Sequence, residues 1–243
     1  MNFKSIEITH QGNVRKNNED YYVYTSIDEN NHLFMVADGM GGLQAGEIAS
    51  QIACQTVASY FIMQKQKELI EDSFKNSIEI ANEKIYNYGK SNNLKSIGTT
   101  AVILFFEKEK AYYAHIGDSR LYLLEKQSLT QLTKDHSYIQ YLLDQNQITP
   151  QQAKTHPKRS LVTRAIGVEP TPNPSICEQT IEITKGQFFL LCTDGLFNSL
   201  ENETIQDILL KNIDIEQKAN DLLSKSLELG GADNITFILI EIL

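Results

Sequence analysis

The chain has 243 residues, of which 41% are hydrophobic and 22% charged, a composition typical of a globular protein with a sizeable core. Its formal net charge of −9 argues against a general nucleic-acid-binding protein, because such proteins present a basic face. We therefore expect no nucleic-acid partner. The chain has no apolar run near the ~20 residues of a membrane span and no signal-peptide core, so we expect no membrane partner. Its three cysteines include no C-x-x-C pair, and we expect a cytoplasmic protein.

The first half of the chain is predicted to combine short strands with two long helices. Apolar runs predict strands at residues 3–9, 21–24, 33–37, 99–106, 111–116 and 120–124. Between them the apolar period changes to that of a helix, and amphipathic helices are expected at 48–61 and 69–85. We expect these two helices to be antiparallel neighbours, joined by the polar residues 64–67.

The second half of the chain is predicted to contain further paired helices and strands. Helices are expected at 137–148, from the cap-and-proline pair Thr149-Pro150, at 203–211 and at 215–229. Strands are expected at 176–183, 187–193 and 235–242. The polar and irregular segment 146–171 is either a mobile loop or lid, or a decorated connection. Because no linker divides the chain and the helices come in pairs, we expect one α+β domain of antiparallel sheets covered by helices.

One pattern occurs four times: an apolar run that breaks at an aspartate followed by a small or turn-forming residue. The four pairs are Asp38-Gly39, Asp118-Ser119, Asp194-Gly195 and Asp233-Asn234. Each pair alone is explained by turn chemistry, since these residue types tolerate positive φ. If their strands lie side by side, however, four carboxylates converge on one place, and they would repel one another unless cations lay among them.

The residue types favour a hard divalent cation over other kinds of catalytic site. The five histidines and three cysteines are scattered, which argues against zinc, and the sequence contains no EF-hand loop, G-x-S-x-G or Walker motif. Oxygen ligands from aspartate suit Mg²⁺ or Mn²⁺. The simplest mechanism for such a site is two-metal hydrolysis of a phosphate ester, in which an arginine holds the phosphate.

Eight motifs in this order resemble the protein phosphatase 2C family, the metal-dependent Ser/Thr phosphatases, in its bacterial single-domain form. The resemblance extends almost from end to end of the chain. The motifs lie at residues 14–20 (VRKNNED), 36–42 (VADGMGG), 98–101 (GTTA), 117–120 (GDSR), 132–137 (LTKDHS), 161–167 (LVTRAIG), 193–195 (TDG) and 231–234 (GADN). Any one of them could arise by chance, whereas all eight together are highly specific.

The resemblance implies a four-layer αββα sandwich, with two antiparallel sheets flanked by pairs of antiparallel helices, and a single catalytic domain over 1–243. It also implies hydrolysis of phosphoserine and phosphothreonine by in-line attack of a metal-bridging hydroxide. We expect the enzyme to be a monomer that acts on proteins phosphorylated by a partner Ser/Thr kinase. Segment 146–171 would be the flap beside the active site, which tunes substrate choice. Two alternatives stay open: a silent pseudophosphatase or regulatory binding module, and a phosphatase of a small phosphorylated metabolite.

The resemblance further assigns metal ligands by matching motif positions. Asp38 would bridge two Mn²⁺ or Mg²⁺ ions, and the Gly39 carbonyl would bind one of them. The other ion would be held by Asp194 and Asp233. Asp118 matches a residue that binds a third, weaker ion in bacterial members of the family.

The remaining assignments concern the substrate and the proton donor. Arg15 matches the arginine that grips the substrate phosphate, while Glu19 and Asp20 match positions that usually hold metal-bound waters. In some relatives a histidine follows the first Asp-Gly and is thought to protonate the leaving group; here that position is Met40. A metal-bound water is then the preferred donor, and His136 is a poorer candidate, because a lone histidine after a strand more often serves structure.

Overall fold

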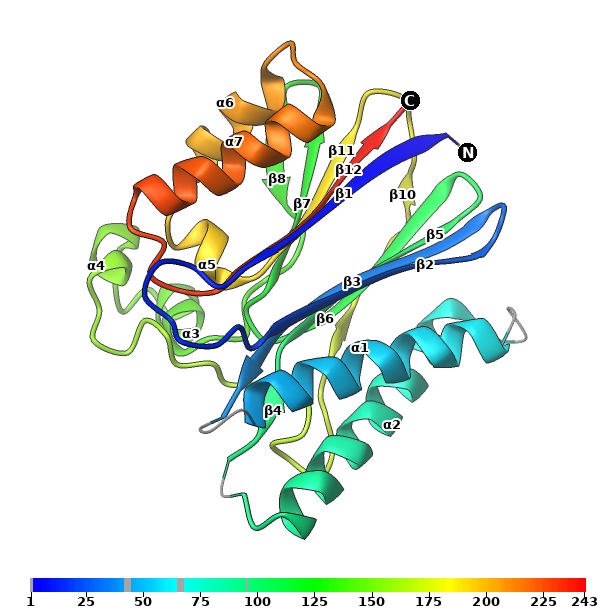
Figure 1. Cartoon of the computed structure of the whole chain (residues 1–243), viewed down its shortest axis with the longest axis vertical. Coiled ribbons are helices and arrows are strands. Elements are labelled where there is room, and N and C mark those ends of the chain that lie inside the picture. The colour runs from blue at the N-terminus through cyan, green and yellow to red at the C-terminus, as the bar shows by residue number, and fades with distance from the viewer. Residues whose placement is uncertain (1, 42–44, 65–67, 95) are drawn as a thin grey trace.

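Two antiparallel sheets form the centre of the protein in a computed structural model that describes residues 2–41, 45–64, 68–94 and 96–243 (Figure 1). The first sheet has the order β1 (Phe3–His10), β12 (Ile235–Ile242), β11 (Phe188–Cys192), β7 (Arg120–Glu125) and β8 (Ser128–Gln131). The second has the order β10 (Ile181–Glu182), β6 (Lys110–Ile116), β5 (Ala101–Glu107), β3 (Asn31–Met40) and β2 (Asp20–Asp28), with β4 (Gly98–Thr99) on β3 and β9 (Ser175–Ile176) on β6.

Helices cover the outer faces of both sheets (Figure 1). The second sheet is covered by α1 (Ala45–Gln64) and α2 (Ile70–Ser91), and the first by α6 (Asn202–Leu210) and α7 (Ile215–Glu228). Shorter helices lie at one end of the layers: α3 (Tyr138–Asp144), α4 (Pro150–Lys154) and α5 (Asp194–Phe197). The predicted four-layer αββα arrangement is confirmed.

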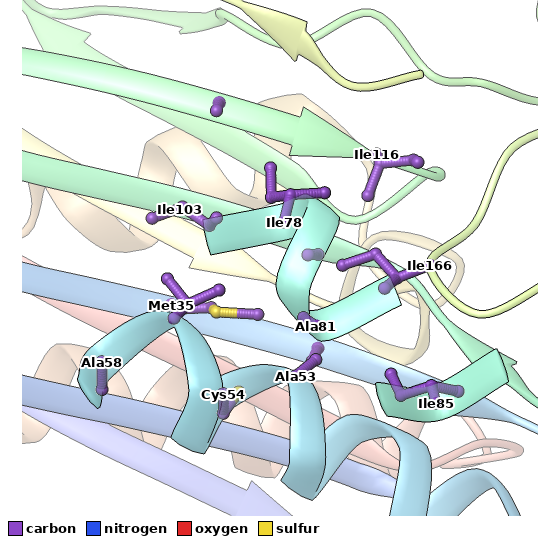
Figure 2. Close-up of a cluster of buried hydrophobic side chains, with 14 of the residues drawn as sticks. Met35, Ala53, Cys54, Ala58, Ile78, Ala81, Ile85, Ile103, Ile116 and Ile166 are labelled. Carbon is purple, nitrogen blue, oxygen red and sulfur yellow. The ribbon is translucent and has the colours of Figure 1, made fainter. Parts of the chain in front are cut away.

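Strand β3 explains how the layers are held together, because it is buried on both faces. Side chains alternate across a strand. Leu33 and Met35 therefore face the hydrophobic cluster under α1 and α2, and Figure 2 shows this cluster. Phe34 and Val36 face the other sheet. A strand buried on both faces consists almost entirely of apolar residues, which is why 33–37 appears in the sequence as an unbroken run. A third cluster, around Leu190 and Phe237 and their neighbours, packs the first sheet against α6 and α7.

Strands β1 and β12 pair along their whole length and bring the chain ends together. Their register runs from Phe3 opposite Ile242 to His10 opposite Ile235. Beyond it, the Leu243 N–H donates to the Asn2 carbonyl at 3.0 Å. The N and C labels consequently lie side by side in Figure 1, at the end of the sheet away from α5.

Several predicted elements differ from the structure. Strand β3 does not end before Asp38 but continues to Met40, because β4 pairs with its last two residues. The strand predicted at 176–183 is two short pieces, each paired with the edge of β6. Helix α3 is shorter than the predicted 137–148. Residues 65–67 of the predicted helix connection, and Gly42 of the 36–42 motif, lie outside the described residues.

The predicted flap, 146–171, contains α4, whose first turn is closed by a capping box between Thr149 and Gln152. Its C-terminal end is fixed to α2 by the buried Asn82, which donates to the Glu169 and Pro170 carbonyls and accepts from the Gly167 N–H at 2.6 Å. The role of this segment in substrate choice stays a prediction. Of the helices in the described part of the chain, none combines the length and apolar character that crossing a membrane requires.

Candidate metal centre

The four predicted aspartates come from distant parts of the chain and meet between the two sheets at one end. Asp38 lies in β3, Asp118 in the turn after β6, Asp194 at the start of α5 directly after β11, and Asp233 just before β12. Burial is the main cause of the raised pKa of Asp38, and the negative charges of Asp20 and of the other three aspartates add to it. The convergence expected from the repeated pattern is therefore present in the structure.

Asp38 is held by its backbone on both sides. Its carbonyl accepts the Thr100 N–H and the Thr99 hydroxyl, each at 2.9 Å, and its N–H donates to the Thr100 hydroxyl at 3.1 Å. Burial, followed by the surrounding carboxylates, raises the pKa of the Asp38 carboxyl well above its usual range. Asp20 lies directly opposite Asp38 in the β2–β3 pair, and facing like charges in a sheet are destabilising.

The neighbouring carboxyls are perturbed in the same direction. Burial is the main cause in each case: it raises the pKa of Asp20 to about 7, of Asp118 to about 7 and of Asp194 to about 6. Hydrogen bonds offset part of the effect, since Asp20 accepts from the Thr193 hydroxyl at 2.8 Å and Asp194 from the Asn198 amide at 3.0 Å. The site is thus a cluster of buried and half-buried carboxyl groups whose charged forms are disfavoured in the absence of a cation.

Gly39 packs so closely on neighbouring backbone that no side chain could replace its hydrogen. A Cβ built at Gly39 would lie 2.1 Å from the Gly46 carbonyl oxygen and 2.5 Å from that of Glu19. The Gly39 N–H also donates to the Glu19 carbonyl at 3.1 Å. Only glycine allows the first turn of α1 to approach the strand this closely.

Arg15 lies at the edge of the carboxylate cluster and forms an ion pair with Asp233. The distance from Arg15 Nη2 to Asp233 Oδ2 is 2.6 Å, and 51% of the Arg15 side chain is exposed to solvent. This hydrogen bond raises the pKa of the Arg15 guanidinium, and the charges of Asp194 and Asp38 add to the effect. The phosphate-binding role of Arg15 stays a prediction, and in the structure its guanidinium contacts a predicted metal ligand.

Asn234 was not predicted as part of the site, although it ends the quoted 231–234 motif. Its amide donates to the Gln11 and Asn17 carbonyls at 2.9 Å, and its carbonyl oxygen accepts the Glu19 N–H at 2.9 Å. These bonds fix the loop that carries Arg15 and Glu19 beside Asp233. Burial raises the pKa of the Glu19 carboxyl.

The chemistry of these residues fits a hard divalent cation, because the donors are carboxylate oxygens whose mutual repulsion a cation would relieve. As the side chains stand, however, no three or more His, Cys, Asp or Glu in the described ranges form a group that could hold a metal ion. One oxygen of each of three carboxylates is engaged in a hydrogen bond instead. The Arg15 guanidinium donates to Asp233. The Thr193 hydroxyl donates to Asp20, and the Asn198 amide donates to Asp194. Asp38, Asp118 and Asp194 are nevertheless close enough to one another and to Asp233 for the neighbouring negative charges to add to the rise in their pKa that burial causes.

His136 is poorly suited to be a proton donor. Its Nδ1 accepts the Gly117 N–H at 3.2 Å, its Nε2 lies 2.9 Å from the Ser175 hydroxyl, and its ring stacks on His115 at 4.6 Å. Burial, and then the charges of His115 and Arg164, lower its pKa to about 3. The ring is neutral at pH 7 and fixes the turn before Asp118, so the geometry favours a structural role.

The raised carboxyl pKa values predict that the metal-free protein loses stability as the pH rises. A carboxyl group whose pKa is higher in the folded than in the unfolded state binds its proton more tightly when folded, so this stabilisation is lost as pH rises through the folded pKa. Histidines with lowered pKa, such as His136, act in the opposite direction but below about pH 6.5. With chelator, we expect the free energy of unfolding to fall by on the order of 2 kcal/mol from about pH 6.5 to about pH 8.

Urea unfolding followed by circular dichroism at several pH values measures this slope. Adding Mn²⁺ at the upper end of the range should restore the lost stability, because a cation replaces the protons. The variant Asp118→Asn is the matched test, since it removes one raised carboxyl and should flatten the slope. A free energy of unfolding that is constant or rises over this range would contradict the prediction.

Known proteins similar to this chain are phosphatases. The profile of the family "Protein phosphatase 2C" matches residues 10–228. Protein phosphatase PhpP of Streptococcus pneumoniae is 34% identical over 235 residues, which are 96% of this chain and 95% of that protein. The solved S. agalactiae serine/threonine phosphatase has a TM-score of 0.94 at 31% identity and covers 100% of both chains. The catalytic domain of the phosphatase PstP, solved with two manganese ions, has a TM-score of 0.84 at 31% identity and covers 98% of this chain and 97% of that one.

Proposed function

The chain belongs to the protein phosphatase 2C family, and from that premise we propose that it hydrolyses phosphoserine and phosphothreonine in proteins at a centre of two divalent cations. The observation that carries the proposal is the convergence of carboxylates from distant segments on one place, with an arginine beside them. The matched PstP domain, solved with two manganese ions, supports the choice of Mn²⁺ or Mg²⁺.

We assign the cation ligands as the family motif implies. Asp38 would bridge two ions, with the Gly39 carbonyl on one and Asp194 and Asp233 on the other, and Asp118 would hold a third, weaker ion. When bound, such a pair of cations supplies an activated water for in-line attack and offsets the charge of the phosphoryl oxygens. The protein's part is to hold the carboxylates rigidly, which the backbone bonds around Asp38 do.

Arg15 binds the substrate phosphate in this proposal. Its planar guanidinium can donate two parallel hydrogen bonds to phosphoryl oxygens, a geometry that a lysine ammonium does not reproduce. In the structure the same group pairs with Asp233, and because the side chain is half-exposed it can turn toward a substrate. Glu19 and Asp20 lie beside the cluster and would hydrogen-bond waters around the ions. The proton donor to the leaving group stays unassigned, since the thioether side chain of Met40 has no acidic proton to donate.

The substrates in this proposal are phosphorylated proteins, since the matched relatives are named protein or serine/threonine phosphatases. We further propose that the enzyme opposes a Ser/Thr kinase in the cytoplasm and acts as a monomer whose catalytic unit is the whole of 1–243. A partner kinase and the assembly state can be identified by co-purification and by light scattering.

Hydrolysis of a phosphoserine peptide and of a panel of small phosphorylated metabolites tests the function. We expect turnover of the peptide with Mn²⁺, a loss of about 100-fold or more in excess chelator, and recovery when Mn²⁺ or Mg²⁺ is restored. Full activity in chelator would overturn the metal-dependent mechanism. Faster turnover of a metabolite than of any phosphopeptide would instead favour the small-molecule alternative.

A further inference from the structure

The GTTA motif at 98–101 interrupts the sheet directly opposite Asp38. Strand β5 pairs with β3 as far as Val102 opposite Val36, and β4 resumes the pairing with Thr99 opposite Gly39 in the same register. Thr100 is therefore the partner of Asp38 in the ladder. In a regular hydrogen-bonded pair of an antiparallel sheet, each residue donates its N–H to the carbonyl of the other.

Thr100 meets only half of that pattern with its backbone. Its N–H donates to the Asp38 carbonyl at 2.9 Å, but the Asp38 N–H donates to the Thr100 hydroxyl, at 3.1 Å, instead of to the Thr100 carbonyl. That carbonyl accepts the Thr99 hydroxyl at 2.9 Å. A side-chain oxygen thus replaces a backbone oxygen at the position of the predicted bridging carboxylate.

The same hydroxyl also contacts the turn that carries Asp118. Thr100 Oγ1 lies 2.6 Å from Ser119 Oγ, and both residues are 1% exposed. Ser119 directly follows Asp118. The Thr100 side chain also packs on Gly117, which has φ +101°, and a Cβ added there would lie 2.6 Å from Thr100 Cβ. One buried hydroxyl therefore connects the Asp38 strand to the Asp118 turn through two hydrogen bonds.

We propose that Thr100 is a positioning residue whose hydroxyl, bonded to Asp38 and Ser119, fixes the spacing of the Asp38 and Asp118 carboxylates for cation binding. This inference rests on the proposed function, because it takes both carboxylates as ligands. Residues that hydrogen-bond to metal ligands and orient them contribute roughly 10- to 100-fold to metal affinity or activity. A buried N–H that loses its acceptor raises the free energy of the folded state, so the strand is expected to shift until the N–H finds another acceptor.

The test compares Thr100→Val with Thr100→Ser, since valine keeps the shape without the hydroxyl and serine keeps the hydroxyl without the methyl group. We expect Thr100→Val to weaken Mn²⁺ binding about tenfold or more and Thr100→Ser to restore most of the affinity. Isothermal titration calorimetry and the electron paramagnetic resonance signal of Mn²⁺ measure this without turnover. Steady-state kinetics with a phosphopeptide should show a lower kcat at nearly constant KM, because Arg15 still binds the phosphate.

Controls separate this inference from the proposed function. Wild type and Asp38→Asn are titrated in the same series: if wild type binds Mn²⁺ and Asp38→Asn does not, the metal centre stands. If Thr100→Val then binds Mn²⁺ as tightly as the wild type, only the role of Thr100 is overturned. If Thr100→Ser loses as much affinity as Thr100→Val, the effect comes from packing on Gly117, and the role of the hydroxyl is overturned as well. Should Thr100→Val fail to fold, Ser119→Ala breaks the same bond from the other side, and unchanged affinity there rejects the inference. Thr130→Val, at an exposed position of β8, is the control for the substitution itself.

Discussion

Replacing Asp38 by asparagine is expected to abolish phosphopeptide hydrolysis while the protein stays folded. We expect a loss in kcat/KM of about 1,000-fold or more, which corresponds to about 4 kcal/mol of transition-state stabilisation. Asparagine is nearly isosteric but brings no charge to share between two cations, so Mn²⁺ binding should be lost as well. Steady-state kinetics and calorimetric titration with Mn²⁺ measure the two effects.

The same substitution should stabilise the metal-free protein, which separates loss of activity from loss of fold. Burial and the facing carboxylates make the charged form of Asp38 unfavourable, so removing the charge should raise the melting temperature in chelator at about pH 8. The rise in melting temperature that Mn²⁺ gives the wild type should disappear. Asp207→Asn, at an exposed position of α6, is the matched control and should resemble the wild type. Activity within tenfold of the wild type in Asp38→Asn would exclude the bridging role.

Removing the arginine at the edge of the site is expected to weaken substrate binding without weakening metal binding. For Arg15→Ala we expect kcat/KM for a phosphopeptide to fall about 100-fold, or roughly 3 kcal/mol. Arg15→Lys should recover part of this, because a point charge replaces the planar fork. Mn²⁺ affinity should be equal or higher, since Asp233 is released from its ion pair.

Inhibition by inorganic phosphate isolates this effect from chemistry. The inhibition constant should rise in parallel with KM in Arg15→Ala, because both report contact with phosphoryl oxygens. Lys16→Ala removes an exposed cation from the neighbouring position and should change little. An unchanged inhibition constant in Arg15→Ala would assign the arginine to Asp233 alone and leave the phosphate without a protein ligand.

The sequence predicted those elements whose own residues determine them. The periodicity over 48–61 and 69–85 predicts helices because each has one apolar face. Helix α1 extends the first range at both ends, and α2 extends the second at its C-terminal end only. The alternation-free run at 235–242 became β12 without a change of bounds. By contrast, β8 is a four-residue polar edge strand and α5 a single helical turn, and segments this short carry no periodicity.

The sequence indicated that the Asp carboxylates meet, but it did not indicate the contacts that they make. The repeated Asp at a strand end predicted the convergence, since strands of a sheet place their ends together. The extension of β3 through Asp38, the pairing of Arg15 with Asp233 and the substitution of the Thr100 hydroxyl for a carbonyl depend on which segments meet in space. A sequence contains that information only through the fold, so these contacts had no local signal.

The pairing of β1 with β12 has a practical consequence for work on this enzyme. Both chain ends leave the sheet at the edge where Phe3 faces Ile242, while Asp233 precedes the opposite end of β12. A strand of this length spans about 26 Å at ~3.3 Å per residue. A fluorophore, affinity tag or surface tether attached at either terminus therefore stands a full strand away from the carboxylates, and can report on or immobilise the enzyme without covering them.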